Sequence, residues 1–176
     1  MKYIALLRGI GPGDPRMTND KLRGVFESLG FSDVESLISS GNIIFSSSVV
    51  PQESNIEKAI EDQLGFFRPI VIRSQADIES LVELHPFGDA AHSQQTYTLV
   101  TFLKTPPDSL PFDIPFQSLD GYFEIVHYDQ KTQALFSKTD HTMVKTPKVM
   151  IWLEKQLGKD ITSRTWKTIE RINSKF

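Results

Sequence analysis

Two short stretches near the start of the chain carry side chains that could hold an anion. Arg8 and Gly9 end an apolar run, and residues 39–42 separate two others. A guanidinium pairs with phosphate or carboxylate oxygens, while glycine N–H groups and serine hydroxyls donate hydrogen bonds to them. These groups predict a site for a small anionic or phosphorylated ligand. The candidate ligand-binding residues are Arg8, Gly9, Ser39, Ser40, Gly41 and Asn42.

Ordinary turn chemistry is the alternative interpretation of the same residues. Glycine and asparagine adopt backbone angles that most residues avoid, and serine hydroxyls satisfy nearby backbone groups. On this interpretation Arg8 forms a local salt bridge, and the residues stabilise the turns without binding a ligand.

The segment from Thr162 to Lys167 supplies two further candidates, Arg164 and Trp166. We expect this segment to begin a helix, because threonine and serine are good caps and Ile169 and Ile172 follow at helical spacing. A helix start can hold phosphate, and a tryptophan ring can stack on a base. Arg164 and Trp166 are therefore predicted to close the ligand site. The alternative is a capping and core-packing role.

Several catalytic and cofactor-binding patterns do not occur in the sequence. The chain has no cysteine, which excludes disulfides, thiolate zinc sites and cysteine nucleophiles. Its four histidines lie far apart and match no metal-binding spacing. Gly9, Gly11 and Gly13 do not fit a dinucleotide-binding loop, because the third glycine stands one place early. The sequence predicts no metal, no cofactor and no recognisable catalytic motif, and it leaves enzymatic activity undecided.

Charge is distributed unevenly along the 176 residues. The net charge of −3 disfavours duplex binding by a generally basic surface. Residues 131–176 nevertheless carry ten basic and four acidic side chains. This basic quarter either pairs with acidic segments of the same chain or binds RNA or single-stranded nucleic acid, which is the second hypothesis. A structural or protein-interaction role without a ligand is the third.

Apolar runs in the sequence are short. None approaches the length of a membrane span, and the run from Tyr3 to Leu7 is too short for a signal peptide. Together with the lack of cysteine, this predicts a cytoplasmic protein with no membrane partner. The oligomeric state is not predicted, because an exposed sheet edge can pair with a second copy.

The elements of the first half determine where the anion-binding candidates lie. Apolar spacing and glycine and proline punctuation predict the order β-α-β-β-α-β. Right-handed crossovers place the first strand beside the third, in the arrangement called ferredoxin-like. The end of the first strand and the turn at 39–42 then share one edge of the sheet, near Arg8. The predicted elements are strand 3–8, helix 18–30, strands 34–38 and 43–47, helix 56–64 and strand 69–73.

The second half is predicted to be less regular, although its succession of strands followed by a helix resembles the first half. Four prolines between residues 106 and 115 exclude regular structure there. The predicted domains are residues 1–74 and 75–176, packed as a single compact unit. The expected elements are helix 75–84, strand 96–104, a hairpin of strands 122–128 and 133–137, helix 149–157 and a last helix from Thr162.

Three motifs resemble the bacterial domain-of-unknown-function family 1697 (DUF1697). They are Ile-Ala-Leu-Leu-Arg-Gly-Ile at 4–10, Leu-Ile-Ser-Ser-Gly-Asn-Ile-Ile-Phe at 37–45 and Thr-Ser-Arg-Thr-Trp-Lys-Thr at 162–168. The resemblance spans residues 2–172 and implies an α+β fold of two ferredoxin-like halves, the second irregular, with no assigned activity. Two departures concern binding: Gly11-Pro12-Gly13-Asp14 replaces the family's N-V-G-G, and Thr165 and Lys167 replace asparagines.

Overall fold

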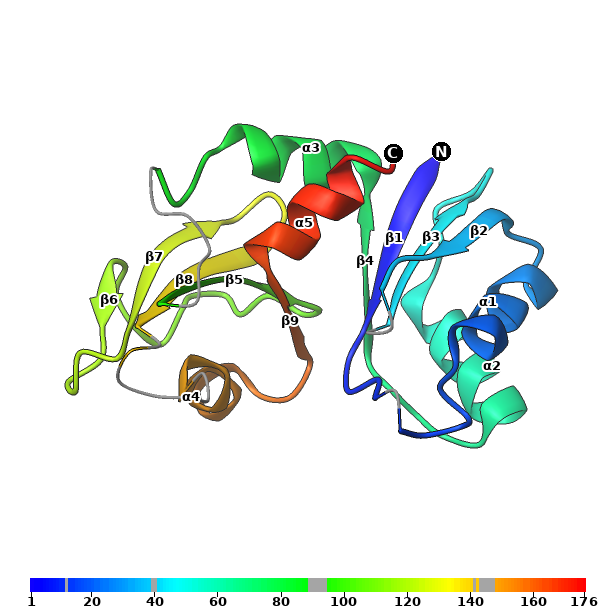
Figure 1. The fold of residues 1–176 in the computed structure, drawn as a ribbon, viewed down its shortest axis with the longest axis horizontal. Coiled ribbons are helices and arrows are strands. Elements are labelled where there is room, and N and C mark those ends of the chain that lie inside the picture. The colour runs from blue at the N-terminus through cyan, green and yellow to red at the C-terminus, as the bar shows by residue number, and fades with distance from the viewer. Residues whose placement is uncertain (12, 39–40, 89–94, 141, 143–147) are drawn as a thin grey trace. The chain divides into compact units, whose positions relative to one another are not determined.

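The structure is a computed structural model of the chain. It describes all residues except 12, 39–40, 89–94, 141 and 143–147. The chain forms two compact units, which we call unit 1 (Met1–Ile78 with Phe176) and unit 2 (Glu79–Lys175). Each unit is built around its own antiparallel sheet (Figure 1).

Unit 1 contains a four-stranded sheet with two helices on one face (Figure 1). Its strand order is β2-β3-β1-β4, and β1 pairs antiparallel with both β3 and β4. The first strand therefore lies beside the third, as the sequence pattern predicts. The elements are β1 (Lys2–Leu7), α1 (Asn19–Ser28), β2 (Ser32–Ser36), β3 (Asn42–Ser46), α2 (Glu53–Leu64) and β4 (Ile70–Ser74).

Local signals explain where the two helices of unit 1 begin and end. The Thr18 side chain accepts a hydrogen bond from the Lys21 N–H at 3.4 Å, which caps the first turn of α1. α2 ends at Gly65, whose φ of +73° lies in the left-handed region that favours glycine. Each helix buries one apolar face against the sheet. The buried residues are Leu22, Val25 and Phe26 of α1 and Ile56, Ala59 and Ile60 of α2.

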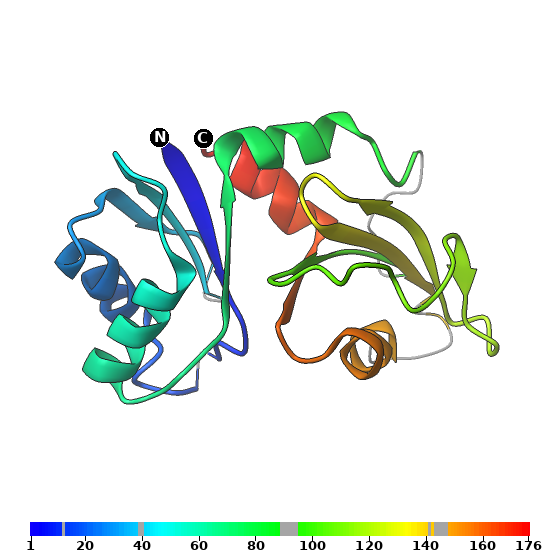
Figure 2. The same cartoon turned by 180° about the vertical axis from the view of Figure 1, so that it is seen from behind.

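Unit 2 contains a five-stranded sheet in the order β6-β7-β8-β5-β9. A further helix, α3 (Gln75–Glu83), spans the boundary between the units. α4 lies on one face of the sheet and α5 on the other (Figure 2). The elements are β5 (Thr96–Leu103), β6 (Phe116–Gln117), β7 (Phe123–Asp129), β8 (Ala134–Asp140), α4 (Lys148–Leu157), β9 (Ile161–Thr165) and α5 (Trp166–Asn173).

The predicted fold class, α+β, is confirmed, since both sheets are antiparallel and carry helices. The predicted start of the last helix at Thr162 is wrong. Ile161–Thr165 is instead a strand that pairs antiparallel with β5, so tertiary pairing overrides the local helix signal. The helix begins only at Trp166, and its cap is Thr165, whose hydroxyl accepts from the Thr168 N–H at 3.2 Å.

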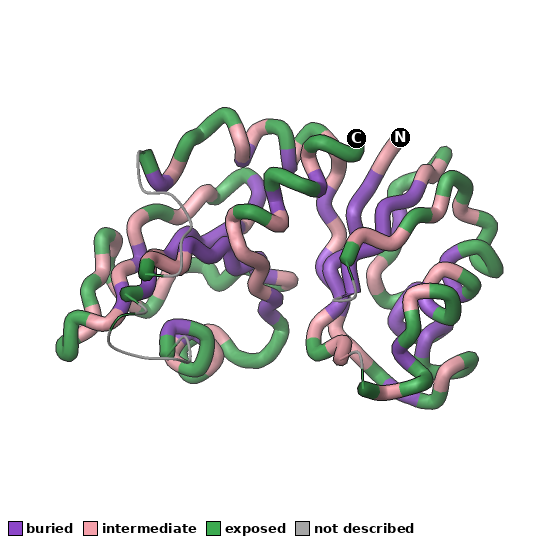
Figure 3. The backbone as a smooth tube through the Cα atoms, viewed as in Figure 1, coloured by how far each residue is buried: buried purple, intermediate pink, exposed green. Residues whose placement is uncertain are grey.

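Buried residues follow the central strands of each sheet, and exposed residues gather in the loops and on outer helix faces (Figure 3). In unit 1 the fully buried rings of Phe26 and Phe45 pack together, with 5.2 Å between their centroids. Within the described parts of the chain, no helix has both the length and the apolar character needed to cross a bilayer.

Candidate functional site

One end of the unit 1 sheet brings together residues from three distant segments. The Leu7 N–H donates to the Gly41 carbonyl at 2.8 Å, and the Arg8 N–H donates to the Pro69 carbonyl at 3.1 Å. The structure therefore places Arg8, Gly9 and Gly41 at the same edge. Ser39 and Ser40 lie outside the described residues.

Gly41 is held by its neighbours as well as by its conformation. Its φ is +73°, and a Cβ atom there would lie 2.6 Å from Ile10 Cγ1 and 2.9 Å from Leu7 Cβ. Only glycine fits this approach between the turn and the first loop. The adjacent Asn42 is fully buried and donates from Nδ2 to the Leu37 carbonyl at 3.0 Å. Asn42 thus holds the hairpin together.

Two arginines that the sequence analysis did not single out lie at the same edge. Arg68 approaches the Gly9 carbonyl with Nε at 3.4 Å, and its guanidinium lies 5.5 Å from the centre of the Phe66 ring. The Arg16 guanidinium lies 5.7 Å from the same ring. We call Arg8, Gly9, Arg16, Arg68 and the buried Phe66 the arginine rim.

Asp14 is the acidic residue of the first loop, and it pairs with Arg16. Its Oδ2 lies 2.8 Å from Arg16 Nη2, and its Oδ1 accepts from Arg16 Nε at 3.1 Å. These hydrogen bonds, first of all those of the Arg16 side chain, lower the pKa of Asp14 from 3.8 to about 2. Asp14 therefore neutralises the Arg16 guanidinium, and the Arg68 guanidinium adds a positive charge to the rim.

Arg164 and Trp166, the other two predicted site residues, belong to unit 2. Arg164 donates from Nη1 to its neighbours, the Ser163 carbonyl at 2.9 Å and Thr162 Oγ1 at 3.3 Å. Desolvation by burial lowers its pKa to about 10, so it stays protonated at neutral pH. The Trp166 ring packs edge-on against Phe87, at 5.4 Å between centroids. Trp166 thus packs against the buried ring of Phe87 within unit 2.

Metal ligands do not cluster in the described structure. Among the residues that the structure describes, no group of three or more histidine, aspartate or glutamate side chains is placed to hold a metal ion. Two of the four histidines, His92 and His141, lie outside those residues.

The two antiparallel sheets with their helices define an α+β protein of two compact units. The chain belongs to the family described as "Protein of unknown function (DUF1697)", whose pattern matches residues 1–116. The predicted family is thereby confirmed, and the match includes the motifs at 4–10 and 37–45, whereas the motif at 162–168 lies outside it.

A similar fold occurs in a solved structure, described as that of conserved bacterial protein SP0830 from Streptococcus pneumoniae. The TM-score is 0.66 with 22% sequence identity, and the match covers 98% of this chain and 97% of the other. At that identity the likeness concerns the fold alone. No curated protein matches the chain.

Proposed function

We propose that this protein binds a small anionic ligand, a phosphorylated compound, at the arginine rim. The observation that carries the proposal is the placement of the Arg68 guanidinium over the buried ring of Phe66 and beside Gly9, with the Arg16–Asp14 pair next to the same ring. A ring beneath a guanidinium limits its motion, so less side-chain entropy is lost when an anion binds.

The surrounding backbone supports the same chemistry. Gly9 has a φ of +64° and carries no side chain, so the Arg68 side chain can lie against its backbone. Arg68 joins this loop through the Gly9 carbonyl. Arginine pairs with two phosphate oxygens at once, which favours phosphate over a monovalent halide. The positive charge that Asp14 leaves on the rim is the attraction in this proposal.

The setting of the rim belongs to the same proposal. The element order of unit 1 together with the strand order β2-β3-β1-β4 supports a ferredoxin-like description of this unit. A cytoplasmic location, where phosphorylated small molecules are abundant, is also proposed. The predicted closing role of Arg164 and Trp166 is not needed for binding at the rim.

A titration followed by ¹⁵N NMR tests the proposal, with inorganic pyrophosphate and a sugar phosphate as probes. We expect saturable shifts at Gly9 and at the Nε signals of Arg16 and Arg68. Arg68→Gln should weaken binding about tenfold, because a charge-assisted hydrogen bond is lost. Lys58→Gln removes one positive charge from an exposed position of α2 and is the matched control. Equal weakening by both variants would reject the rim.

The nucleic-acid hypothesis is separated by an oligonucleotide arm of the same experiment. Polyanion binding falls steeply with salt, whereas a compact site depends on salt less. If a single-stranded oligonucleotide binds and shifts residues of the basic quarter, 131–176, while pyrophosphate leaves Gly9 unchanged, the nucleic-acid hypothesis replaces the rim. If neither probe binds, the structural role without a ligand is favoured.

A further inference from the structure

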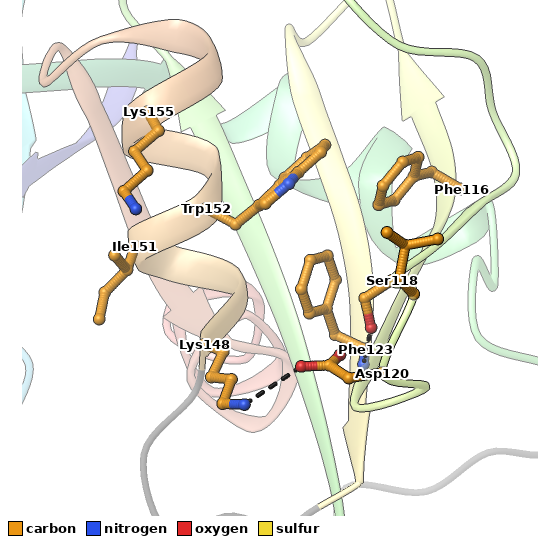
Figure 4. A pocket seen from close by; sticks show the side chains of 9 residues that line it. Phe116, Ser118, Asp120, Phe123, Lys148, Ile151, Trp152 and Lys155 are labelled. Atoms are coloured by element: carbon orange, nitrogen blue, oxygen red, sulfur yellow. Dashed lines mark hydrogen bonds and ion pairs between the residues drawn. The ribbon is translucent and has the colours of Figure 1, made fainter.

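Unit 2 contains a cavity of about 430 Å³ between α4 and the segment that carries β6 and the start of β7 (Figure 4). Volumes in this range are typical of sites for small organic molecules. The cavity is separate in sequence from every residue of the arginine rim. Its lining residues are Phe116, Ser118, Leu119, Asp120, Phe123, Lys148, Ile151, Trp152 and Lys155.

Three aromatic rings from three elements form the walls of this cavity, which we call the aromatic pocket. Trp152 of α4 stacks on Phe116 of β6 with 4.5 Å between centroids and 27° between planes. Trp152 also meets Phe123 of β7 at 5.5 Å in a tilted arrangement. Because ring edges and faces attract one another, a further ring entering the pocket would gain the same contacts.

Exposed apolar side chains border the same pocket. Leu119 is fully exposed, at 109% of its reference area, and Ile151 is 55% exposed. Both line the cavity, so an occupant would cover surface that now faces water. Because removing apolar surface from water is favourable, this border favours an occupant that is largely apolar.

Two lysines of α4 flank Trp152 along one face of the helix, at positions four before it and three after it (Figure 4). Lys148 is engaged by Asp120, with Nζ and Oδ2 3.1 Å apart, and lies over the Tyr122 ring. Lys155 is exposed, and Figure 4 shows its side chain along α4 beside Ile151. The lining thus holds one carboxylate, paired with Lys148, and two ammonium groups, so the charge of the pocket is positive.

Unpartnered polar groups lie beside a lining ring. Thr139 stands directly opposite Phe123, and Ser137 opposite Ile125, so both side chains share the Phe123 face of the sheet. Each residue is 1% exposed, and neither hydroxyl has a hydrogen-bond partner among the residues that the structure describes. A buried unpaired hydroxyl in a native structure calls for an explanation, such as a water or a bound molecule.

We propose that the aromatic pocket binds a small aromatic carboxylate of one or two fused rings. The ring packs against Trp152 and Phe116, and the carboxylate pairs with the Lys155 ammonium, away from Asp120. Ring walls select an aromatic body, and the positive charge selects an acid over an amide. This site is independent of the arginine rim, and either one can fail without the other.

The two tryptophans of the chain provide a built-in control for the test. Trp152 lines the pocket, while Trp166 packs against Phe136 on the opposite face of the sheet. Protein labelled with 5-fluorotryptophan gives two ¹⁹F signals, which Trp166→Phe assigns. We expect 2-naphthoate to shift the Trp152 signal saturably and to leave the Trp166 signal in place.

Matched ligands test the two parts of the recognition. The amide 2-naphthamide keeps the rings and lacks the charge, and we expect it to bind about threefold more weakly. Decahydro-2-naphthoate keeps the charge and lacks the aromatic rings, and we expect about fivefold weaker binding. If the saturated acid binds as tightly as 2-naphthoate, the pocket does not select aromatic rings and the proposal fails.

Matched variants test the role of Lys155. Lys155→Met should lower the affinity for 2-naphthoate to that for the amide, and it should leave amide binding unchanged. Lys167→Met removes the same charge from an exposed position on α5 and should change neither affinity. Equal shifts of both tryptophan signals, or no saturation up to millimolar 2-naphthoate, would overturn the site.

Discussion

The arginine rim and the aromatic pocket combine cations with aromatic rings in opposite ways. At the rim the buried ring of Phe66 lies beneath two guanidinium groups, so the charges face outward. In the pocket the rings form the walls, and the two lysines lie on α4 about one turn before and one turn after Trp152. The first arrangement suits a ligand that is mostly charge, and the second suits a ligand that is mostly ring.

The two regions also differ in how their polar groups are satisfied. At the edge of unit 1, Asn42 and Asp14 are hydrogen-bonded within the chain. Beside the pocket, the buried hydroxyls of Ser137 and Thr139 find no partner in the described part of the chain. The edge of unit 1 is therefore held by its own contacts, whereas unit 2 carries an uncompensated desolvation cost. Substitutions in the two regions measure how much each contributes to the free energy of unfolding.

The largest effect is expected at Gly41, where the turn lies closely against Leu7 and Ile10. Gly41→Ala combines a left-handed conformation with a Cβ atom 2.6 Å from Ile10, and we expect a loss of about 3 kcal/mol in the free energy of unfolding. Urea unfolding measures it. Gly30 also has a positive φ, +82°, but its Cβ would meet nothing within 4 Å. Gly30→Ala should cost only about 1 kcal/mol; equal losses would show that packing at Gly41 is unimportant.

A gain of stability is expected at Thr139. Thr139→Val removes an unpartnered buried hydroxyl while keeping the shape, so the free energy of unfolding should rise by about 1 kcal/mol. The control is Thr101→Val in the same sheet, where the hydroxyl bonds to Ser163 Oγ at 2.7 Å. That change should lower stability by about 1 kcal/mol. A loss in both variants would mean that Thr139 has a partner in solution, and the contrast between the two regions would disappear.

The fold of unit 1 could be predicted because its signals are local. The Thr18 cap, the Gly65 stop and the apolar stripes of α1 and α2 lie within a few residues of the boundaries they determine. β9 could not be predicted in this way, because its strand character comes from pairing with β5, about 60 residues earlier. The capping residues at Thr162 and Ser163 suggest a helix when they are considered alone.

Only the part of the arginine rim that the sheet topology positions could be predicted from the sequence. Crossover rules place Arg8 near the turn at Gly41, and the structure brings the two together. Arg68 joins them through a contact with Gly9 that spans 59 residues, which no local pattern indicates. The aromatic pocket was missed because Phe116 follows a proline-rich segment, and its strand, β6, is two residues long.

The smallest effect concerns the charge of the rim and tests whether Asp14 is neutralised. Its folded-state pKa, about 2, lies below the ordinary 3.8, so its pairing with Arg16 stabilises the fold above pH 3.8 and is lost as the pH falls through 2. In a ¹³C NMR titration Asp14 should still be mostly ionised at pH 3. Arg16→Gln removes the partner and should move the midpoint up toward 3.8. A midpoint of 3.8 in the wild-type protein would mean that Asp14 is not paired with Arg16. Its carboxylate would then offset the charge of Arg68, and the rim would lose the positive charge that distinguishes it as a phosphate site.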